Sequence, residues 1–211
     1  AYTVTVRSSG TGTGSLTGAG SYRRGTTATL TATPSSGSVF SGWYDVNDKL
    51  LSTDATYSFT VSSNVTIYAR FTKAYTVTIK TSGSGTVTGG GTYPDGSTAA
   101  LTAVPADGHT FMGWYDRSGK LLSTNLTYSF PVSANVTVTA QFGSTITLKP
   151  SRSGSVLGGG TYPDGTEVTL TAQPTTDREF QGWYTPSGVQ LSEDSSYKVT
   201  ADGAQTVIGM F

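Results

Sequence analysis

The chain has 211 residues, no cysteine, and thirteen basic against thirteen acidic residues, so its formal net charge is zero. The missing cysteines exclude disulfide bridges and thiolate metal sites. A neutral chain without a run of basic residues is a poor partner for a nucleic-acid backbone. Its apolar runs are only a few residues long, so we expect no membrane-inserted segment.

The sequence contains one unit three times. Trp43, Trp114 and Trp183 lie 71 and then 69 residues apart, and each sits in a Phe-x-Gly-Trp-Tyr motif. Several other positions keep the same offset from the tryptophans: Leu30, Leu101 and Leu170; Pro34, Pro105 and Pro174; Tyr57, Tyr128 and Tyr197; Phe71, Phe142 and Phe211. Repetition at this period predicts copies of one small module rather than a single specialised active site.

We place the three domains at residues 1–73, 74–143 and 144–211, called copies 1, 2 and 3 below. A module of this size has little core to stabilise it, and here it has no disulfide to help. Stability must therefore come from an aromatic-rich core and from contacts between neighbouring copies.

The expected elements are clearest in copy 2, where apolar and polar residues alternate with period two. Strands are predicted at about 75–80, around 87, and at 99–105, 111–115, 128–132 and 136–142, separated by glycine-rich and Pro-Asp-Gly turns. No stretch shows helical periodicity. The predicted fold is all-β, with about six short strands in each of three tandem modules.

The predicted junctions are very short. Only Thr72 and Lys73 separate the last strand of copy 1 from the first strand of copy 2, and the second junction is two residues shorter. Linkers of this length cannot act as flexible tethers. We therefore expect an elongated rod, with each module about 25–30 Å across by size scaling.

The combined order of motifs resembles a known family. Each copy carries a Thr-Val-Thr-type first strand, a glycine loop, a Leu-Thr-Ala-x-Pro strand and the Phe-x-Gly-Trp-Tyr motif. Copies 2 and 3 add Gly-x-Tyr-Pro-x-Gly, and copies 1 and 2 add Asn-Val-Thr. This order is similar to the divergent internalin B-type repeat, related to the B repeats of Listeria internalin and to the Listeria–Bacteroides repeats. The resemblance covers essentially the whole chain and implies a compact β module, with a variation on the β-grasp as one candidate.

The same resemblance implies tandem modules of secreted or wall-anchored bacterial proteins, generally regarded as spacers or adhesion modules, without catalytic residues to transfer. Copy 3 departs most from the pattern, since Ala204 replaces the asparagine found at Asn64 and Asn135, and Thr185 replaces Asp116. These departures weaken any surface site that would have to recur in copy 3.

The tryptophans are the candidate ligand contacts. Trp43, Trp114 and Trp183 could form an aromatic ladder for glycan rings, or they could pack inside the modules. Strict alternation places Trp114 on the face opposite Phe111 and Tyr115. The packing role is the more common one for such residues, and it is the favoured interpretation.

The other chemistry-bearing residues favour structural roles. His109 is the only histidine and is predicted to be a solvated loop residue. Asp95 and Asp164 occupy Pro-Asp-Gly turns, where aspartate caps the local backbone. Asp45, Asn47 and Asp48 cluster in a turn that matches no calcium loop. We therefore predict no catalytic residue, no metal site and no cofactor.

Together these features predict a non-enzymatic tandem-repeat segment of a bacterial cell-surface or secreted protein. It would act as a semi-rigid spacer and contribute to adhesion. The alternative is a module that binds a surface glycan or a host protein through exposed aromatics. The expected partners are neighbouring repeats or domains of the same chain, and we expect a monomer. The Ser/Thr/Gly-rich, cysteine-free composition favours an extracellular location.

Overall fold

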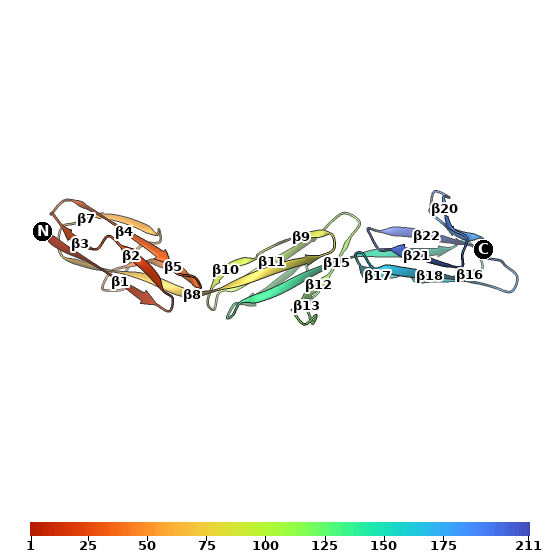
Figure 1. Cartoon of the computed structure of the whole chain (residues 1–211), viewed down its shortest axis with the longest axis horizontal. Coiled ribbons are helices and arrows are strands. Elements are labelled where there is room, and N and C mark those ends of the chain that lie inside the picture. Colours follow the sequence, from red (N-terminus) through yellow and green to blue (C-terminus); the bar gives the residue numbers. More distant parts are fainter. The chain divides into compact units, whose positions relative to one another are not determined.

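The computed structural model describes residues 1–211 and consists of strands and turns, with no helix (Figure 1). No segment is therefore a helix long and apolar enough to cross a membrane. The chain divides into two compact units. One comprises residues 1–77, 91–99 and 130–136, and the other comprises 78–90, 100–129 and 137–211. The dividing line runs through copy 2, so both junctions between copies lie inside a unit.

Each copy contains eight strand segments, counting a strand that it shares with its neighbour. Copy 1 has β1 (Tyr2–Gly10), β2 (Gly14–Thr17), β3 (Gly20–Tyr22), β4 (Thr27–Pro34), β5 (Ser38–Tyr44), β6 (Leu50–Ser52), β7 (Thr56–Thr60) and β8 (Val65–Ser82). Copy 2 continues with β9 (Gly85–Thr88), β10 (Gly91–Pro94), β11 (Thr98–Pro105), β12 (Thr110–Tyr115), β13 (Leu121–Ser123), β14 (Thr127–Pro131) and β15 (Val136–Pro150). Copy 3 adds β16 (Gly154–Leu157), β17 (Gly160–Pro163), β18 (Glu167–Pro174), β19 (Gly182–Tyr184), β20 (Gln190–Ser192), β21 (Ser196–Thr200) and β22 (Gln205–Met210).

The all-β prediction is confirmed, but the estimate of about six strands per copy was too low. It missed segments such as β3 and β6, which are three residues long. A segment this short cannot display period-two alternation, so its strand character comes only from pairing with a longer neighbour. β3 pairs with β1, and β6 pairs with β5.

Copy 1 folds as two packed sheets. In the larger sheet the first strand, β1, runs parallel to the last strand, β8, and β3 and β5 flank this pair in antiparallel orientation. The smaller sheet has the order β2-β4-β7. Copy 3 repeats both arrangements, with β15 parallel to β22 and a second sheet β16-β18-β21. A β-grasp sheet packs on a helix, whereas here a three-stranded sheet occupies that layer.

An aromatic triplet fills the core between the two sheets. In copy 1, Trp43 packs with Phe40 and Phe40 with Phe71, with ring centroids 5.4 and 5.8 Å apart. The equivalent distances are 5.3 and 5.5 Å in copy 2, and 5.2 and 5.5 Å in copy 3. Leu30 and Ile67, both buried, complete the core of copy 1. Tilted and edge-to-face rings at these distances add attraction beyond the area they bury.

A β-bulge decides which way each tryptophan points. Phe111 pairs with Phe142 and Gly113 pairs with Gln141, so two steps along β12 correspond to one step along β15. The extra residue brings Trp114 to the same side as Phe111. The prediction that these two side chains lie on opposite faces was therefore wrong, because it assumed unbroken alternation. Gly113 has φ +148°, and a Cβ there would lie 2.6 Å from Leu121.

Neighbouring copies share a strand. β8 runs without interruption from the end of copy 1 into the start of copy 2, and β15 does the same between copies 2 and 3. The residues that were expected to be a two-residue linker are thus part of a sheet. Lys73 still donates its backbone N–H to the Thr11 hydroxyl, and its carbonyl accepts from the N–H of Asp95.

Replacing Trp183 with alanine should lower the free energy of unfolding of copy 3 by about 3–5 kcal/mol, the usual cost of removing a large buried aromatic ring. Trp183 is 0% exposed and touches Phe180. Urea unfolding followed by circular dichroism measures the change. Leu157→Ala is the control, because Leu157 is 52% exposed and its loss should cost less than about 0.5 kcal/mol. Equal costs for the two variants would contradict the described core.

Gly119→Ala should destabilise the β12–β13 turn by about 1 kcal/mol, and Gly119→Asp should cost less. Gly119 has φ +82°, with open space around it, so the cost comes from the backbone alone. Asp48 occupies the equivalent turn position in copy 1 with φ 65°, which shows that aspartate tolerates this conformation. The two variants are compared by thermal unfolding, and a ranking of alanine above aspartate would contradict this reading of the turn.

Candidate functional site at the second junction

The structure places all three predicted ligand contacts inside the cores. Trp43, Trp114 and Trp183 are each 0% exposed. Their indole N–H groups donate to the backbone carbonyls of Asp54, Asn125 and Asp194 at 3.0–3.1 Å. A ring with no accessible face cannot stack on a glycan unless the core opens. The buried positions therefore match the packing role.

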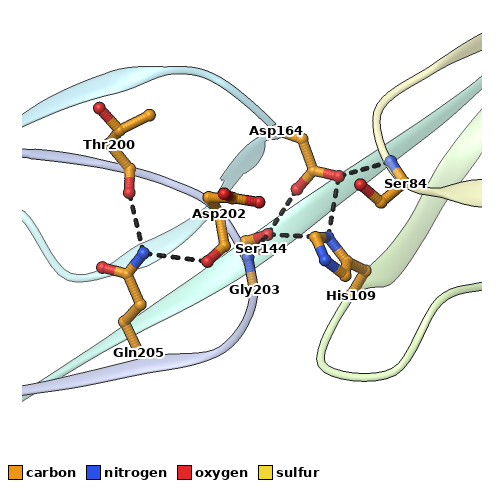
Figure 2. A network of polar contacts seen from close by, with 8 residues as sticks. All are labelled: Ser84, His109, Ser144, Asp164, Thr200, Asp202, Gly203 and Gln205. Carbon is orange, nitrogen blue, oxygen red and sulfur yellow. Dashed lines mark hydrogen bonds and ion pairs between the residues drawn. The ribbon is translucent and has the colours of Figure 1, made fainter.

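A polar cluster that combines serine, histidine and aspartate lies at the junction of copies 2 and 3, inside one compact unit (Figure 2). Ser144 comes from β15, His109 from the loop before β12, and Asp164 from the turn between β17 and β18. The His109 Nδ1 atom is 2.9 Å from Oδ2 of Asp164 and 3.2 Å from the Ser144 hydroxyl. The Ser144 hydroxyl donates to Oδ1 of Asp164.

Local turn chemistry positions the aspartate. Pro163-Asp164-Gly165-Thr166 forms a turn in which the N–H of Thr166 donates to the carbonyl of Pro163 at 3.1 Å. Asp164 is the first corner of this turn, and glycine at the second corner accepts the positive φ that is required there, which is +83° at Gly165. The carboxylate is thereby presented to copy 2, where the backbone N–H of Ser84 donates to it at 2.8 Å.

The cluster is largely buried, and Ser144 and Asp164 both use their hydrogen-bonding atoms within it. Ser144 is 0% exposed, and its hydroxyl accepts from the backbone N–H of Gly203 at 2.8 Å. The side chains of His109 and Asp164 are 11% and 8% exposed. Figure 2 shows how Ser84 and His109 from copy 2 meet Ser144, Asp164 and the Gly203 loop of copy 3 around one point. Buried polar groups that satisfy one another rigidify the place where they meet.

The geometry does not match that of a catalytic triad. A triad needs its aspartate on one histidine nitrogen and its serine on the other. Here Ser144 and Asp164 both face Nδ1 of His109, and the single proton of the serine hydroxyl goes to the carboxylate. Nδ1 must then carry a proton to contact Oδ2. Ser144 also has no accessible surface from which to attack a substrate. These buried contacts hold copies 2 and 3 together. The group formed by Ser84, His109, Ser144, Asp164 and Gly203 is called the lock below.

The carboxylate of Asp164 is held in its ionised form. Burial raises the pKa of this group, but hydrogen bonds from the Ser144 hydroxyl, the Ser84 N–H and His109 outweigh the effect and leave the pKa below its ordinary value. The carboxylate therefore stabilises the folded chain at neutral pH.

His109 was predicted to be a solvated loop residue, and that prediction was wrong. Its partners lie 35 and 55 residues away in the sequence, so no local pattern connects them. The available signal was indirect: His109 is unique among the copies, with Ser38 and Arg178 at the equivalent positions, and the junction that follows copy 2 is the shorter one. Asp164 does occupy the predicted turn, but its side chain caps Ser84 of the neighbouring copy rather than its own backbone.

The first junction has a different chemistry. The Lys73 ammonium group lies 5.2 Å from the centre of the Tyr75 ring, and this tyrosine raises the lysine's pKa. The backbone N–H of Ala74 donates to the carbonyl of Gly37 at 2.8 Å. Asn135 also contributes to this junction, since its side-chain oxygen accepts the N–H of Thr76 at 2.8 Å.

No group of three or more histidine, cysteine, aspartate or glutamate side chains could hold a metal ion anywhere in the chain.

Copy 3 lacks the asparagine that links two strands in copies 1 and 2, and it makes another contact instead. Asn64 in copy 1 accepts the N–H of Thr3 at 2.8 Å, as Asn135 does for Thr76. Copy 3 has Ala204 at this position, and the neighbouring Gln205 instead donates to the carbonyls of Thr200 and Asp202 at 2.9 and 3.1 Å (Figure 2). The change from asparagine to Ala204 therefore removes one link between strands, and the hydrogen bonds of Gln205 hold the loop at residues 200–205 instead.

The two-layer all-β module, with one buried tryptophan in each of three copies, defines a repeat domain. The sequence matches the divergent InlB B-repeat domain over residues 2–74, 75–145 and 144–211. The chain belongs to this family and contains three tandem copies of its domain. The family is typical of bacterial surface or secreted proteins and is generally non-catalytic. No curated protein matches the chain.

Ser144→Ala should increase hydrogen exchange at the backbone N–H of Gly203, which loses its acceptor, while Asp164→Asn should do so at Ser84, because a neutral amide is a weaker acceptor. Removing a buried partner of this kind costs about 1–3 kcal/mol. Ser133→Ala, at an exposed position, is the control and should leave both amides protected. Unchanged exchange at Gly203 in Ser144→Ala would contradict the lock.

The contribution of Asp164 should depend on pH. Its folded pKa lies below the ordinary value near 3.9, so its stabilisation is fully present above about pH 4 and is lost as the pH falls through the folded pKa. The difference in melting temperature between the wild type and Asp164→Asn should therefore be largest at neutral pH and should shrink below about pH 4. A difference that is the same at pH 3 and pH 7 would refute this linkage.

Proposed function

We propose that this chain is a non-catalytic, semi-rigid spacer segment of a bacterial cell-surface or secreted protein, and that it contributes to adhesion by holding other parts of that protein away from the surface. The observation that carries the proposal is the pair of shared strands. β8 and β15 each belong to two copies, so no residue at either junction is free of a sheet. Family membership supports the surface location.

The rigidity of the second junction has further support in the buried lock. Ser144 and Asp164 bond to each other, and their remaining partners come from both copies. Bending at this point would break several charge-assisted hydrogen bonds together, which is costly in a buried setting. At the first junction the contacts are mainly backbone hydrogen bonds and a solvent-exposed lysine. We infer that the first junction is the more compliant of the two.

The absence of an enzymatic role is part of the same proposal. The one Ser–His–Asp cluster has the wrong nitrogen geometry and no accessible nucleophile. Copies of one module in series suit a spacer or a multivalent binder better than an enzyme. The alternative role, binding of a surface glycan or host protein through exposed aromatics, would have to use rings other than the buried indoles.

Small-angle X-ray scattering of the chain tests the spacer role. The wild type should give one narrow distribution of sizes. A variant with a flexible Gly/Ser segment inserted between Gly143 and Ser144 should give a broader one, because a flexible linker samples many geometries. The control carries the same insertion in the exposed β12–β13 turn, after Ser118. A wild type that already bends as freely as the insertion variant would overturn the proposal of a semi-rigid spacer.

A further inference from the structure

The outer face of the larger sheet carries a tyrosine in every copy, next to the turn that follows the Gly-Trp-Tyr motif. Tyr44, Tyr115 and Tyr184 occupy this position, and each pairs with the last strand of its copy. These rings are half-buried, unlike the tryptophans before them. The framework around them is the same in each copy, so the side chains that surround the ring can be compared directly.

In copy 1 the space beside this tyrosine is filled. The guanidinium group of Arg70 lies 4.0 Å from the centre of the Tyr44 ring and pairs with Asp48. Tyr68 is the cross-strand partner of Tyr44. Asp48 is the only residue other than glycine with a positive φ, so the chain adopts an uncommon backbone conformation at the residue that holds Arg70 in place.

In copy 2 each of the three filling residues is smaller. Gln141 stands in place of Arg70, Thr139 in place of Tyr68, and Gly119 in place of Asp48. The result is an open hollow of about 340 Å³ beside the turn between β12 and β13, within one compact unit. It is lined by Ser82, Tyr115, Asp116, Arg117, Gly119, Thr139 and Gln141.

The lining combines an aromatic ring with several hydrogen-bonding groups. Tyr115 offers an apolar ring, Gln141 offers both a donor and an acceptor, and Arg117 offers guanidinium donors. Asp116 is held ionised, because the Ser118 hydroxyl and the N–H groups of Lys120 and Ser118 bond to its Oδ1 and lower its pKa. Its Oδ2 has no hydrogen-bond partner in the protein. The hollow therefore places both hydrogen-bond donors and hydrogen-bond acceptors around the ring of Tyr115.

This mixture fits one ligand chemistry. The C–H face of a sugar ring packs against an aromatic ring, and its hydroxyl groups both donate and accept hydrogen bonds. A carboxylate, an amide and a guanidinium together can bind such hydroxyls. A peptide ligand with a cationic side chain would be repelled by Arg117, and one with an anionic side chain would be repelled by Asp116. In copy 3 the residues corresponding to Thr139 and Gln141 are Ile208 and Met210, which cannot bind hydroxyls.

We propose that the copy 2 hollow binds a single pyranose ring of a surface glycan, with Tyr115 as the stacking platform and Asp116, Arg117 and Gln141 as the hydroxyl-binding groups. The site adds a ligand to the spacer and does not depend on the stiffness of the junctions. In copy 1, Arg70 occupies the equivalent tyrosine face and closes the same position. The ligand should bind in the millimolar range, because the site is shallow and holds one ring.

The test is a titration of the whole, isotope-labelled chain with neutral methyl hexopyranosides, followed by amide chemical shifts. At least one sugar should give saturable shifts at Tyr115, Arg117 and Gln141. Gln141→Arg combined with Gly119→Asp rebuilds the filled arrangement of copy 1 and should weaken binding by about tenfold or more, with the fold retained. Tyr115→Ala should weaken it by about five- to tenfold.

Two comparisons make the result specific. Tyr184→Ala in copy 3 is the matched control and should leave the affinity unchanged. Arg70→Gln combined with Asp48→Gly and Tyr68→Thr should open the copy 1 position and create a second site with shifts at Tyr44. Failure of every sugar to give saturable shifts at Tyr115, or preferential saturation of the hollow by an arginine- or glutamate-containing peptide, would overturn the proposal. Neither outcome touches the spacer role, which the scattering experiment tests separately.

Discussion

The indole N–H of each tryptophan donates to a backbone carbonyl eleven residues further along the chain, while the ring fills the space between the two sheets. A module of about 70 residues without a disulfide or a helix has few other large groups to bury. The indole contributes the largest apolar surface and also ties the β6–β7 connection, or its equivalents, to the core. Phe40 and Phe71, with their counterparts, pack around it and complete the triplet.

The bulge at the glycine before each tryptophan makes this packing possible. Without the extra residue the ring would leave the core and point to solvent, and the tyrosine after it would turn inward. With the bulge, the indole is buried and Tyr44, Tyr115 or Tyr184 lies on the outer face. One local irregularity thus sets both the stability of the module and the outward position of the tyrosine.

Sharing of strands places a second constraint on the chain. Because β8 and β15 each serve two copies, a residue at a junction belongs to both neighbours, and the two junctions have diverged in their side chains. The first relies on backbone hydrogen bonds and an exposed lysine, and the second on the buried contacts of Ser144 and Asp164. The outer face has diverged as well, since Arg70, Gln141 and Met210 occupy one equivalent position. The repeated scaffold keeps the core constant and leaves these positions free to specialise.

The sequence by itself determined the repeat, the all-β class, the turn at Asp164 and the family, because each depends on residues close in sequence or on a pattern copied three times. It did not determine which way the indoles face, since alternation alone cannot show a bulge between Phe111 and Gly113. Nor could it show that β1 lies parallel to β8, or that His109, Ser144 and Asp164 meet. These contacts join residues far apart in the chain, and only the packing of the two sheets and the continuity of β15 bring them together.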